Sequence, residues 1–173
     1  IDARSALVPA IRGNVDLVRW QDFADMTELL LERLVREAPA QARAAADAEG
    51  FFSAEASVAV DRSADPIEVT LRVVPGEASR VRSVRIDVTG PAASDVPAGT
   101  DAIARTRDGW LLGPGAVFRN RGWEAAKTRA VDTMRASPYA SATIARSLAD
   151  VDPVERAADL EVGIESGPPF SIG

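Results

Sequence analysis

The sequence contains no cysteine and no histidine, and Lys127 is its single lysine among 173 residues. Without cysteine there is neither a disulfide framework nor a thiol nucleophile, and without histidine the commonest general base and metal ligand is missing. No apolar run approaches the roughly 20 residues that cross a bilayer. These absences leave an enzyme only carboxylate pairs or a Ser-Lys dyad, and we predict that the chain is not an enzyme.

The residues left for catalysis or metal binding do not show the required patterns. Lys127 lies on a predicted helix that also exposes Glu124, a spacing typical of a surface ion pair. Asp150, Asp152 and Glu155 form an acidic loop, but this loop lacks the glycine and the regular ligand spacing of a dedicated calcium loop. We therefore predict no metal site and no cofactor.

Acidic residues outnumber basic residues by 26 to 20, which gives a net charge of −6. Nucleic-acid binding relies on neutralising phosphates with lysine and arginine, so this balance argues against a nucleic-acid partner. An apolar content of 46% with 27% charged residues is typical of a globular protein rather than a disordered one.

One order of sequence features occurs twice, over 38–76 and again over 123–168. An amphipathic, alanine-containing segment leads to an aromatic junction, then to two alternating runs, and then to a Pro-Gly or Gly-Pro stop. Aligning Phe52 with Tyr139 gives an offset of 87 residues, and aligning Gly76 with Gly167 gives 91. A repeat of this length is a small domain, because a solenoid unit is about half as long.

The repeat predicts two tandem α+β domains, 1–77 and 78–168, the first with a shortened first strand. Residues 169–173 are expected to begin a further domain or linker, in a piece cut from a longer protein. Each hairpin has one apolar and one polar face, which requires helices on the apolar face. We predict the order β-α-α-β-β in each domain, with two helices packed on a three-stranded mixed sheet.

Two helices are predicted before the first hairpin. The apolar stripe of the first, over 5–20, consists of Leu7, Ile11, Val15 and Val18. Asp25 and Glu28 form a capping box for the second. The buried side of this second helix is predicted to hold Leu29, Leu30, Leu34 and Val35.

Pro39 marks a break or a fresh first turn, and Gly50 ends the helical segment. Between them lies a thin apolar face of Ala38, Ala42, Ala45 and Ala46 that fits close against a sheet. Two strands follow, over 54–60 and 67–74, joined by a polar turn. The inward residues of the second strand are Ile67, Val69, Leu71 and Val73.

The second half repeats this order. A strand is predicted over 84–88, a weak helix near 96–104, and a turn-rich connection over 109–115. A helix over 120–136, with Asn120 as its cap, buries Trp123, Ala126, Ala130 and Met134. The second hairpin, near 142–146 and 158–164, turns Leu160, Val162 and Ile164 inward.

Several short motifs accompany this order: Glu49-Gly50-Phe51-Phe52, 69–76 and 81–86 in the first repeat, and 115–118 and 123–127 in the second. With these motifs the chain resembles, over nearly its whole length, the polypeptide-transport-associated (POTRA) domains of outer-membrane assembly proteins in the BamA superfamily. The likeness is greatest to the TamA family of autotransporter assembly factors. Ser137-Pro138-Tyr139 departs from the Gly-Tyr-Phe type of junction but keeps the aromatic residue.

The resemblance implies that the third strand of each domain is central and the second is an edge, to which an extended polypeptide adds through main-chain bonds. The candidate edges are Glu55, Ala56, Ser57, Val58, Ala59 and Val60, and Ser141, Ala142, Thr143, Ile144, Ala145 and Arg146. The alternative is that both strands are protected edges, with Glu55, Asp61 and Arg146 deterring pairing.

Two further groups of side chains have more than one interpretation. Trp110 lies on a connection and is a candidate partner-binding aromatic, whereas the other two tryptophans, at helical spacing, are expected to belong to the core. Arg80, Arg82 and Arg85 either contact an acidic lipid or partner or form the polar face of a strand, and we favour the polar face.

The function implied by the resemblance is a periplasmic binding and scaffolding arm, attached to the outer membrane through a C-terminal barrel outside this sequence. The implied partners are unfolded outer-membrane or autotransporter polypeptides and an inner-membrane-anchored, periplasm-spanning protein of the TamB type. Two alternatives stay open, the POTRA region of a two-partner secretion transporter and a cell-division scaffold. Tandem repeats favour the assembly factor, because the division scaffold carries one such domain.

Overall fold

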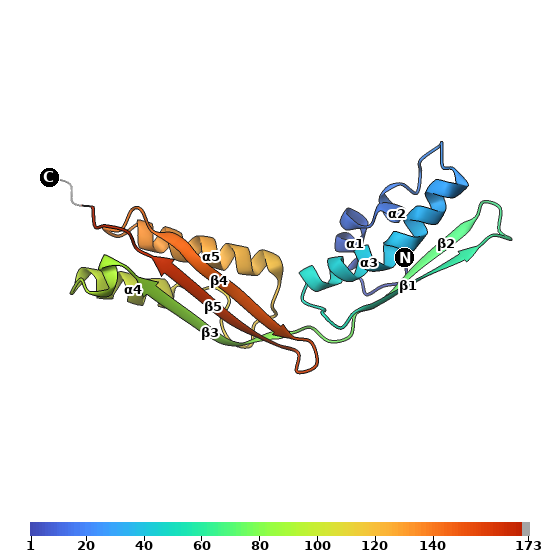
Figure 1. The fold of residues 1–173 in the computed structure, drawn as a ribbon. Helices are drawn as coiled ribbons and strands as arrows, with labels where there is room; N and C mark the ends of the chain where they lie inside the picture. The colour runs from blue at the N-terminus through green and yellow to red at the C-terminus, as the bar shows by residue number, and fades with distance from the viewer. Residues whose placement is uncertain (171–173) are drawn as a thin grey trace. The chain divides into compact units, whose positions relative to one another are not determined.

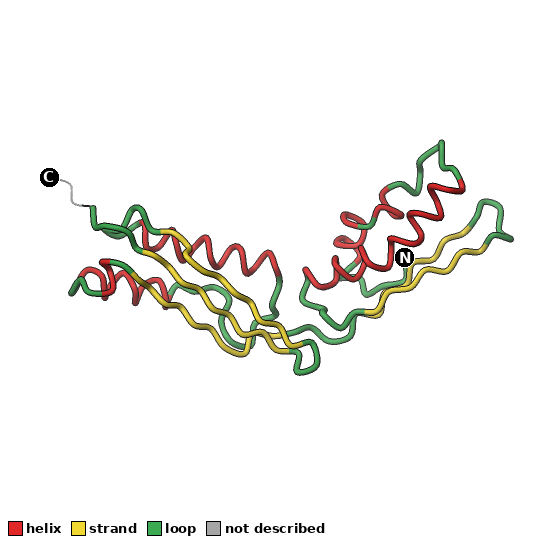
Figure 2. Tube along the Cα trace, in the orientation of Figure 1, coloured by secondary structure: helices red, strands yellow, loops and turns green. Residues whose placement is uncertain are grey.

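The computed structural model describes residues 1–170. Its contacts divide the chain into two compact units, Ile1–Ala78 and Ser79–Gly173, which we call the first and second units (Figure 1). In each unit the helices lie on one face of a single-layer sheet (Figure 2), as predicted for an α+β protein. The further domain or linker expected at 169–173 falls mainly on residues 171–173, which lie outside the described part of the chain.

The first unit has three helices followed by a hairpin: α1 (Val8–Asn14), α2 (Asp16–Arg19), α3 (Glu28–Ala48), β1 (Glu55–Asp61) and β2 (Glu68–Val74). β1 and β2 pair antiparallel without a register shift. On the other side of β2, Asp2 forms an isolated parallel bridge with Arg72. The shortened first strand is thus reduced to one bridging residue, and the sheet of this unit has two strands in place of three.

The first predicted helix is divided in two at Val15. This residue has extended backbone angles, φ −104° and ψ 114°, while its N–H still donates to the Ile11 carbonyl. Leu7, Ile11 and Val15 are nevertheless fully buried, so the predicted stripe is confirmed although the single helix is not. The break rotates the last turn while the chain keeps the same apolar face toward the core.

α3 differs from its prediction at three points. Its N-cap is Thr27, whose Oγ1 accepts a bond of 3.2 Å from the Leu30 N–H, so the capping box at Asp25 is wrong. Leu29 is 80% exposed rather than buried, because the buried stripe of α3 runs through Leu34 and Ala38 and Leu29 lies off this stripe. Pro39 lies inside one continuous helix and does not break it.

The buried alanine face explains how α3 tolerates proline. Proline within a helix removes one backbone bond and costs about 3 kcal/mol. The residues predicted for this face, Ala38, Ala42, Ala45 and Ala46, are all buried. Packing of this face against the hairpin therefore holds α3 together across Pro39.

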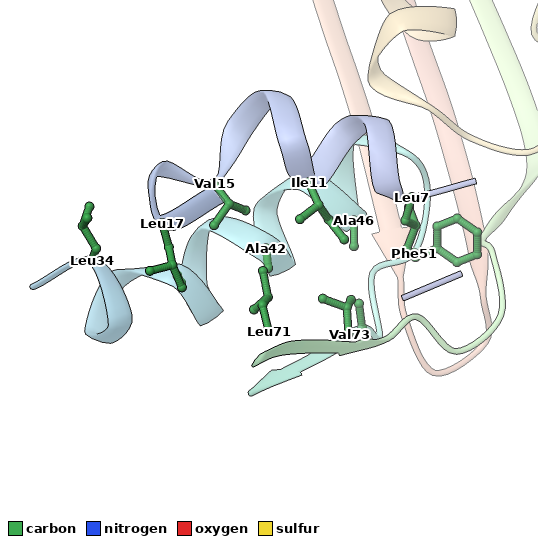
Figure 3. Close-up of a cluster of buried hydrophobic side chains, with 12 residues drawn as sticks. Leu7, Ile11, Val15, Leu17, Leu34, Ala42, Ala46, Phe51, Leu71 and Val73 are labelled. Carbon is green, nitrogen blue, oxygen red and sulfur yellow. The ribbon is translucent and has the colours of Figure 1, made fainter. Parts of the chain in front are cut away.

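Gly50 terminates α3 as predicted. Its φ of 95° lies in the left-handed region, and its N–H donates to the Asp47 carbonyl at 2.9 Å. The Phe51 N–H donates to the Ala46 carbonyl at 3.0 Å, which completes a Schellman motif. The core of the unit then closes between α1, α3 and β2, as Figure 3 shows.

The second unit consists of β3 (Arg80–Thr89), the 3-10 turn η1 (Pro91–Ala93), α4 (Ala98–Asp108), α5 (Asn120–Arg135), β4 (Thr143–Asp152) and β5 (Ala157–Glu165). The strand order is β3-β5-β4, with β3 parallel and β4 antiparallel to the central β5. This is the predicted mixed sheet of three strands with the third strand in the middle. Its inward residues, Leu160, Val162 and Ile164, are at most 2% exposed.

The helices of the second unit follow the prediction in their buried faces more closely than in their ends. Trp123, Ala126, Ala130 and Met134 are buried as predicted. Asn120 is the first residue of α5 rather than its cap, and the residue before it makes no side-chain cap bond. α4 begins at Ala98, two residues later than expected, and Val96 before it is 79% exposed.

The junction before each hairpin is the same in both units, but it pairs Tyr139 with Phe51 rather than with Phe52. The Ala54 N–H donates to the Phe51 carbonyl and the Ala142 N–H to the Tyr139 carbonyl, at 3.1 and 3.0 Å. The offset of 87 residues is therefore one short. Tyr139 also donates from its hydroxyl to Asp95 at 2.5 Å, and burial with this bond raises the pKa of Tyr139 to about 12.

A glycine follows each hairpin and lies against the serine of that junction. Gly76 and Gly167 have φ of 68° and 65°. A Cβ added to Gly76 would lie 2.7 Å from the Ser53 Oγ, and one added to Gly167 would meet the Ser141 Oγ. Both positions require glycine for its backbone freedom and for its small size.

We predict that Gly76→Ala and Gly167→Ala each lower the free energy of unfolding by about 1–2 kcal/mol, because alanine is strained at positive φ and displaces the serine. Gly13→Ala is the matched control. It lies within α1 with nothing within 4 Å of the added methyl group, and should leave stability unchanged or raise it by up to about 1 kcal/mol. Urea denaturation measures all three, and equal effects would contradict the assignment.

Candidate strand-addition edges

One edge of each sheet is covered by the same unit. In the first unit, the Asp2 N–H donates to the Leu71 carbonyl and the Val73 N–H to the Asp2 carbonyl, both at 2.8 Å. In the second, Val81 exchanges backbone bonds with Ala116 and Gly115 at 2.9 and 2.8 Å. These bonds occupy part of each edge and block the addition of another strand at those residues.

An arginine extends this cover along β3. Arg107, at the end of α4, donates from Nε and Nη2 to the Ile86 carbonyl at 3.2 and 3.0 Å. A carbonyl in the outer half of β3 is thereby occupied by a side chain. The opposite edges, formed by β1 and β4, are the candidate functional sites.

The register identifies which backbone groups of β1 face outward. Leu71 and Val73 direct their backbone groups toward Asp2. The alternate residues Thr70, Arg72 and Val74 therefore direct theirs toward β1. Their partners in β1 are Glu55, Ser57 and Ala59, and Asp61 continues the same alternation opposite Glu68. The remaining residues of β1, namely Ala56, Val58 and Val60, direct their N–H and C=O groups away from the hairpin.

The same argument applies to β4. The Ser166 N–H donates to the Thr89 carbonyl at 3.0 Å, and the Arg156 carbonyl accepts from the Arg80 N–H at 2.9 Å. Even-numbered residues of β5 therefore face β3, and odd-numbered residues face β4. The partners of the odd-numbered residues along most of β4 are Arg146, Leu148, Asp150 and Asp152. Ser147, Ala149 and Val151 consequently point their backbone groups outward.

Within residues 1–170, no backbone bond is made to these outward groups of β1 or β4. Each unit thus presents three alternate residues whose donors and acceptors are open on one side. The side chains of Ala56, Val58 and Val60 are half-buried, as are those of Ala149 and Val151. The two edges differ in sequence but offer the same row of main-chain groups.

Not all of the predicted edge residues lie in a strand. Glu55, Ala56, Ser57, Val58, Ala59 and Val60 all lie in β1. Four of the second set lie in β4, namely Thr143, Ile144, Ala145 and Arg146. Ser141 and Ala142 precede β4 in the junction, so their prediction as strand residues is wrong. The reason is that the Ala142 carbonyl accepts from Arg135 Nε at 2.8 Å and its N–H caps the junction turn.

The prediction also missed most of the usable β4 edge, over 147–152. Its only sequence signal was the small or apolar alternation of Ser147, Ala149 and Val151, which the neighbouring acidic residues obscured. A β-bulge at Ala145 shifts the register between Ile144 and Arg146. The regular part of the edge therefore begins after the bulge.

Two of the three charges expected to deter pairing have other roles. Arg146 Nη2 pairs with Glu161 Oε2 of the central strand at 2.6 Å. Asp61 Oδ1 accepts from the Ser63 N–H at 2.9 Å and from its hydroxyl at 2.6 Å, which lowers the pKa of Asp61 and fixes the hairpin turn. Glu55 lies exposed at the start of β1.

The three arginines of β3 bond within the second unit. Arg80 Nη1 donates to the Gly115 carbonyl at 2.7 Å, and Arg85 pairs with Asp87 at 3.0 Å. Arg82 forms a forked pair with Asp159 of β5. These contacts agree with the polar strand face that we favoured.

Trp110, Trp123 and Lys127 belong to one packed group. Trp110 donates from Nε1 to the Leu112 carbonyl at 2.9 Å, and its ring lies edge-on to buried Trp123 with centroids 6.0 Å apart. Lys127 pairs with Glu124 at 2.9 Å, as predicted, and lies 5.0 Å from the Trp123 centroid. Trp110 is half-buried in this group, whereas Trp20 is 43% exposed, against expectation.

The acidic loop shows no metal-binding arrangement. Asp152 Oδ1 accepts from the Val154 and Glu155 N–H groups at 2.9 and 3.0 Å, so it caps the β4-β5 turn. Across residues 1–170, no cluster of three or more acidic side chains that could hold a metal ion is found. In the same range no helix has the length and apolar character needed to span a bilayer.

Comparison with solved structures finds similarity to POTRA domains of outer-membrane proteins. BamA POTRA3-5 from Haemophilus influenzae is 16% identical, with a TM-score of 0.44 over 79% of this chain and 52% of that chain. POTRA1-2 of Omp85 from Anabaena is 14% identical, with a TM-score of 0.45 over 96% of this chain and 88% of that chain. BamA from Haemophilus ducreyi lacking POTRA domains 1-3 is 16% identical, with a TM-score of 0.45 over 95% of this chain and 28% of that chain.

The chain thus spans about half of the first of these proteins and 28% of the last. No protein-family model and no curated protein matches the sequence.

The Arg82 pair gives a prediction for pH dependence. Bonds from Arg82 and Ser83 lower the pKa of Asp159 to about 2, below the unfolded value of about 3.9. The pair therefore stabilises the fold above pH 4, and its contribution is lost as the pH falls from about 4 to about 2. Asp159→Asn should lower the denaturation midpoint at pH 7 but not at pH 2.

Asp150→Asn serves as the control, because Asp150 lies directly opposite Asp159 across the β4-β5 pair. Removing this like charge should not destabilise the fold at pH 7. Thermal melts at both pH values measure the two variants. Equal losses for both at pH 7 would contradict the role given to Arg82.

Proposed function

We propose that the chain is a non-enzymatic, periplasmic binding and scaffolding arm of an outer-membrane protein assembly factor, built from two POTRA-type units. In this proposal each unit holds an unfolded client polypeptide by adding one of its segments as a strand to the outer edge of β1 or β4. The bound client is kept extended and separated from other clients until it is passed on.

The observation that carries the proposal is that each unit has one edge whose backbone groups are partly bonded within the unit and a second edge, β1 or β4, with a regular row of outward backbone groups. Natural proteins usually protect the edges of their sheets, since an open edge invites unwanted pairing. Here Asp2, the 113–117 connection and Arg107 cover one side, while three alternate residues of β1 and of β4 keep outward donors and acceptors. Strand addition is the interaction that such an edge provides.

Main-chain bonding suits a client that varies in sequence. Each added bond contributes about 1 kcal/mol and depends little on the side chain. A short strand therefore gives weak, reversible holding, and two units in one chain multiply it through a raised effective concentration. No group for bond chemistry is required, in keeping with the lack of histidine and cysteine.

The finer assignment rests on the sequence motifs that resemble the TamA family. It makes the clients autotransporter polypeptides and the second partner an inner-membrane-anchored, periplasm-spanning protein of the TamB type. It also places the chain in the periplasm, joined to a membrane barrel outside this sequence. The excess of acidic residues disfavours a nucleic-acid partner.

The test uses proline to remove the outward N–H groups of the two edges. Val58→Pro and Ala149→Pro each delete a donor that makes no bond within the sheet, so both variants should fold. Loss of one bond lowers affinity about fivefold, and the double variant should lose most binding. Fluorescence anisotropy with a urea-unfolded outer-membrane barrel protein, diluted into buffer, measures the affinity.

Val58→Thr and Ala149→Ser are the matched controls, because they change the side chain but keep the N–H. Both should bind within twofold of the parent chain, and circular dichroism verifies the fold of all five variants, the double-proline chain included. Unchanged affinity in the folded double-proline chain would overturn strand addition at these edges.

A further inference from the structure

The helical layer of the second unit contains a groove that the strand edges do not use. It has a volume of about 640 Å³ and lies between α5, the end of α4 and the connection that follows α4. α4 contributes Arg105 to the lining and the connection contributes Leu111. The rest of the lining comes from α5 and its C-cap, namely Ala125, Thr128, Arg129, Asp132, Thr133 and Ala136. These six residues recur at helical spacing, so they form one stripe on the side of α5 away from its buried residues.

One wall of the groove offers an exposed apolar side chain on a fixed backbone. Leu111 is 59% exposed, whereas the neighbouring Leu112 is 7% exposed. On its other side, Trp110 packs edge-on against Trp123 and donates from Nε1 to the Leu112 carbonyl at 2.9 Å. The connection is thus held at both neighbours of Leu111. A partner therefore meets an apolar contact that needs no further ordering.

The groove is basic although the chain is acidic. α5 carries four basic and two acidic side chains, in a chain whose net charge is −6. Arg105 and Arg129 line the groove, and Arg121 precedes the stripe of α5 by one turn. Within residues 1–170 none of these three guanidinium groups forms an ion pair, and neither does Asp132, the carboxylate of the lining. Three cations against one carboxylate attract a ligand of negative charge.

The shape of the groove fits a helix rather than a strand. Its floor is α5, whose backbone groups are bonded within the helix, so the groove offers side chains and no row of main-chain donors and acceptors. The stripe runs from Ala125 to Ala136, roughly 16 Å at about 1.5 Å per residue, which is the length of about three helical turns. An amphipathic helix laid in a groove is a recurring mode of recognition.

An anionic membrane is the other surface that arginine side chains attract. Surfaces that enter the headgroup region usually carry tryptophan or phenylalanine, and the described side chains that line this groove include no aromatic residue. Residues 79–173 contain 12 acidic and 12 basic side chains, so the second unit has no net charge that would draw it to anionic lipid. The local complementarity of the groove therefore favours a protein.

We propose that the groove between α4 and α5 binds an acidic amphipathic helix of a partner protein. The apolar stripe of that helix contacts Leu111, and carboxylates beside the stripe pair with Arg105, Arg121 and Arg129. The ligand differs in kind from the extended clients proposed for β1 and β4, and the inference does not depend on strand addition. The groove attaches the second unit to a helical partner while both strand edges stay free for clients.

The test measures binding of a fluorescent peptide, three repeats of Glu-Leu-Ala-Glu-Leu-Leu-Ala, to the full 173-residue chain by anisotropy. The peptide is long enough to form a helix and places its leucines on one face beside a row of glutamates. Lysine in place of every glutamate should weaken binding about tenfold, and added salt should weaken binding of the glutamate peptide. Proline in the middle repeat prevents the helix and should weaken binding about tenfold.

Three variants of the groove should change the affinity in different directions. Arg129→Glu reverses a charge and Leu111→Asp removes the apolar contact, so each should weaken binding of the glutamate peptide about tenfold. Asp132→Asn removes a like charge and should strengthen binding about twofold. Arg129→Glu should also bind the lysine peptide more tightly than the parent chain does. A purely structural role of these residues would not produce a gain together with the losses.

Arg12→Glu and Val154→Asp are the matched controls, because they make the same two changes at exposed positions outside the groove. Both should bind the glutamate peptide within about twofold of the parent chain. Val58→Pro with Ala149→Pro should do the same, since these substitutions lie in β1 and β4. Circular dichroism of every variant verifies that a loss of binding is not due to unfolding.

Each contrary result overturns the proposal at a defined point. Normal binding by Arg129→Glu and Leu111→Asp would show that the groove is not the site. Equal binding of the proline-containing peptide would rule out a helix as the ligand. If phosphatidylglycerol vesicles bind in a manner that depends on Arg129 and the peptide does not bind, the surface meets lipid and the proposal is wrong. If sedimentation shows a dimer that Leu111→Asp dissociates, a second copy fills the groove in place of a separate partner.

Discussion

Packing of helices on one face of a single-layer sheet is the constraint on which the rest of this structure depends. In the first unit the small side chains of α3 let the helix lie close to the hairpin, and Leu71 and Val73 are buried beneath it. In the second unit Leu160, Val162 and Ile164 of the central strand are covered by the helices in the same way. Because each sheet has so few strands, most of them are edges: β3 and β4 flank the single central strand β5, and both strands of the two-stranded sheet in the first unit are edges.

Exposed edge strands can pair with other chains, and the two units protect part of their edges in different ways. The second unit has a complete first strand and protects it with the 113–117 connection and with Arg107. The first unit has Asp2 in that position, which bonds to Leu71 and Val73 of β2.

The sequence predicted what depends on periodicity and missed what depends on tertiary contact. The alternation of Leu160, Val162 and Ile164 and the stripe at Leu7, Ile11 and Val15 were sufficient to identify the buried faces and the fold class. Local rules alone misplaced the cap at Asp25 and the break at Pro39, because packing of the alanine face overrides the proline. The end of β4 was missed because Asp150 and Asp152 resemble a loop in sequence, although one pairs across the sheet and the other caps its turn. The apolar cavity lined in part by Leu17, Met26 and Ile67 left no signal in the sequence, since it arises where the 20–27 loop approaches the hairpin.

The contact between a glycine after each hairpin and a serine before it has a consequence for the pairing register. Gly76 and Ser53 lie at the two ends of the first hairpin, and Gly167 and Ser141 hold the same places in the second. A slip of one residue along the ladder would move a side chain into the position that only glycine fits, and would turn the core side chains toward solvent. The contact therefore helps to fix the register of the β-hairpin. It ensures that the same alternate residues, and never their neighbours, offer their main-chain groups to an arriving strand.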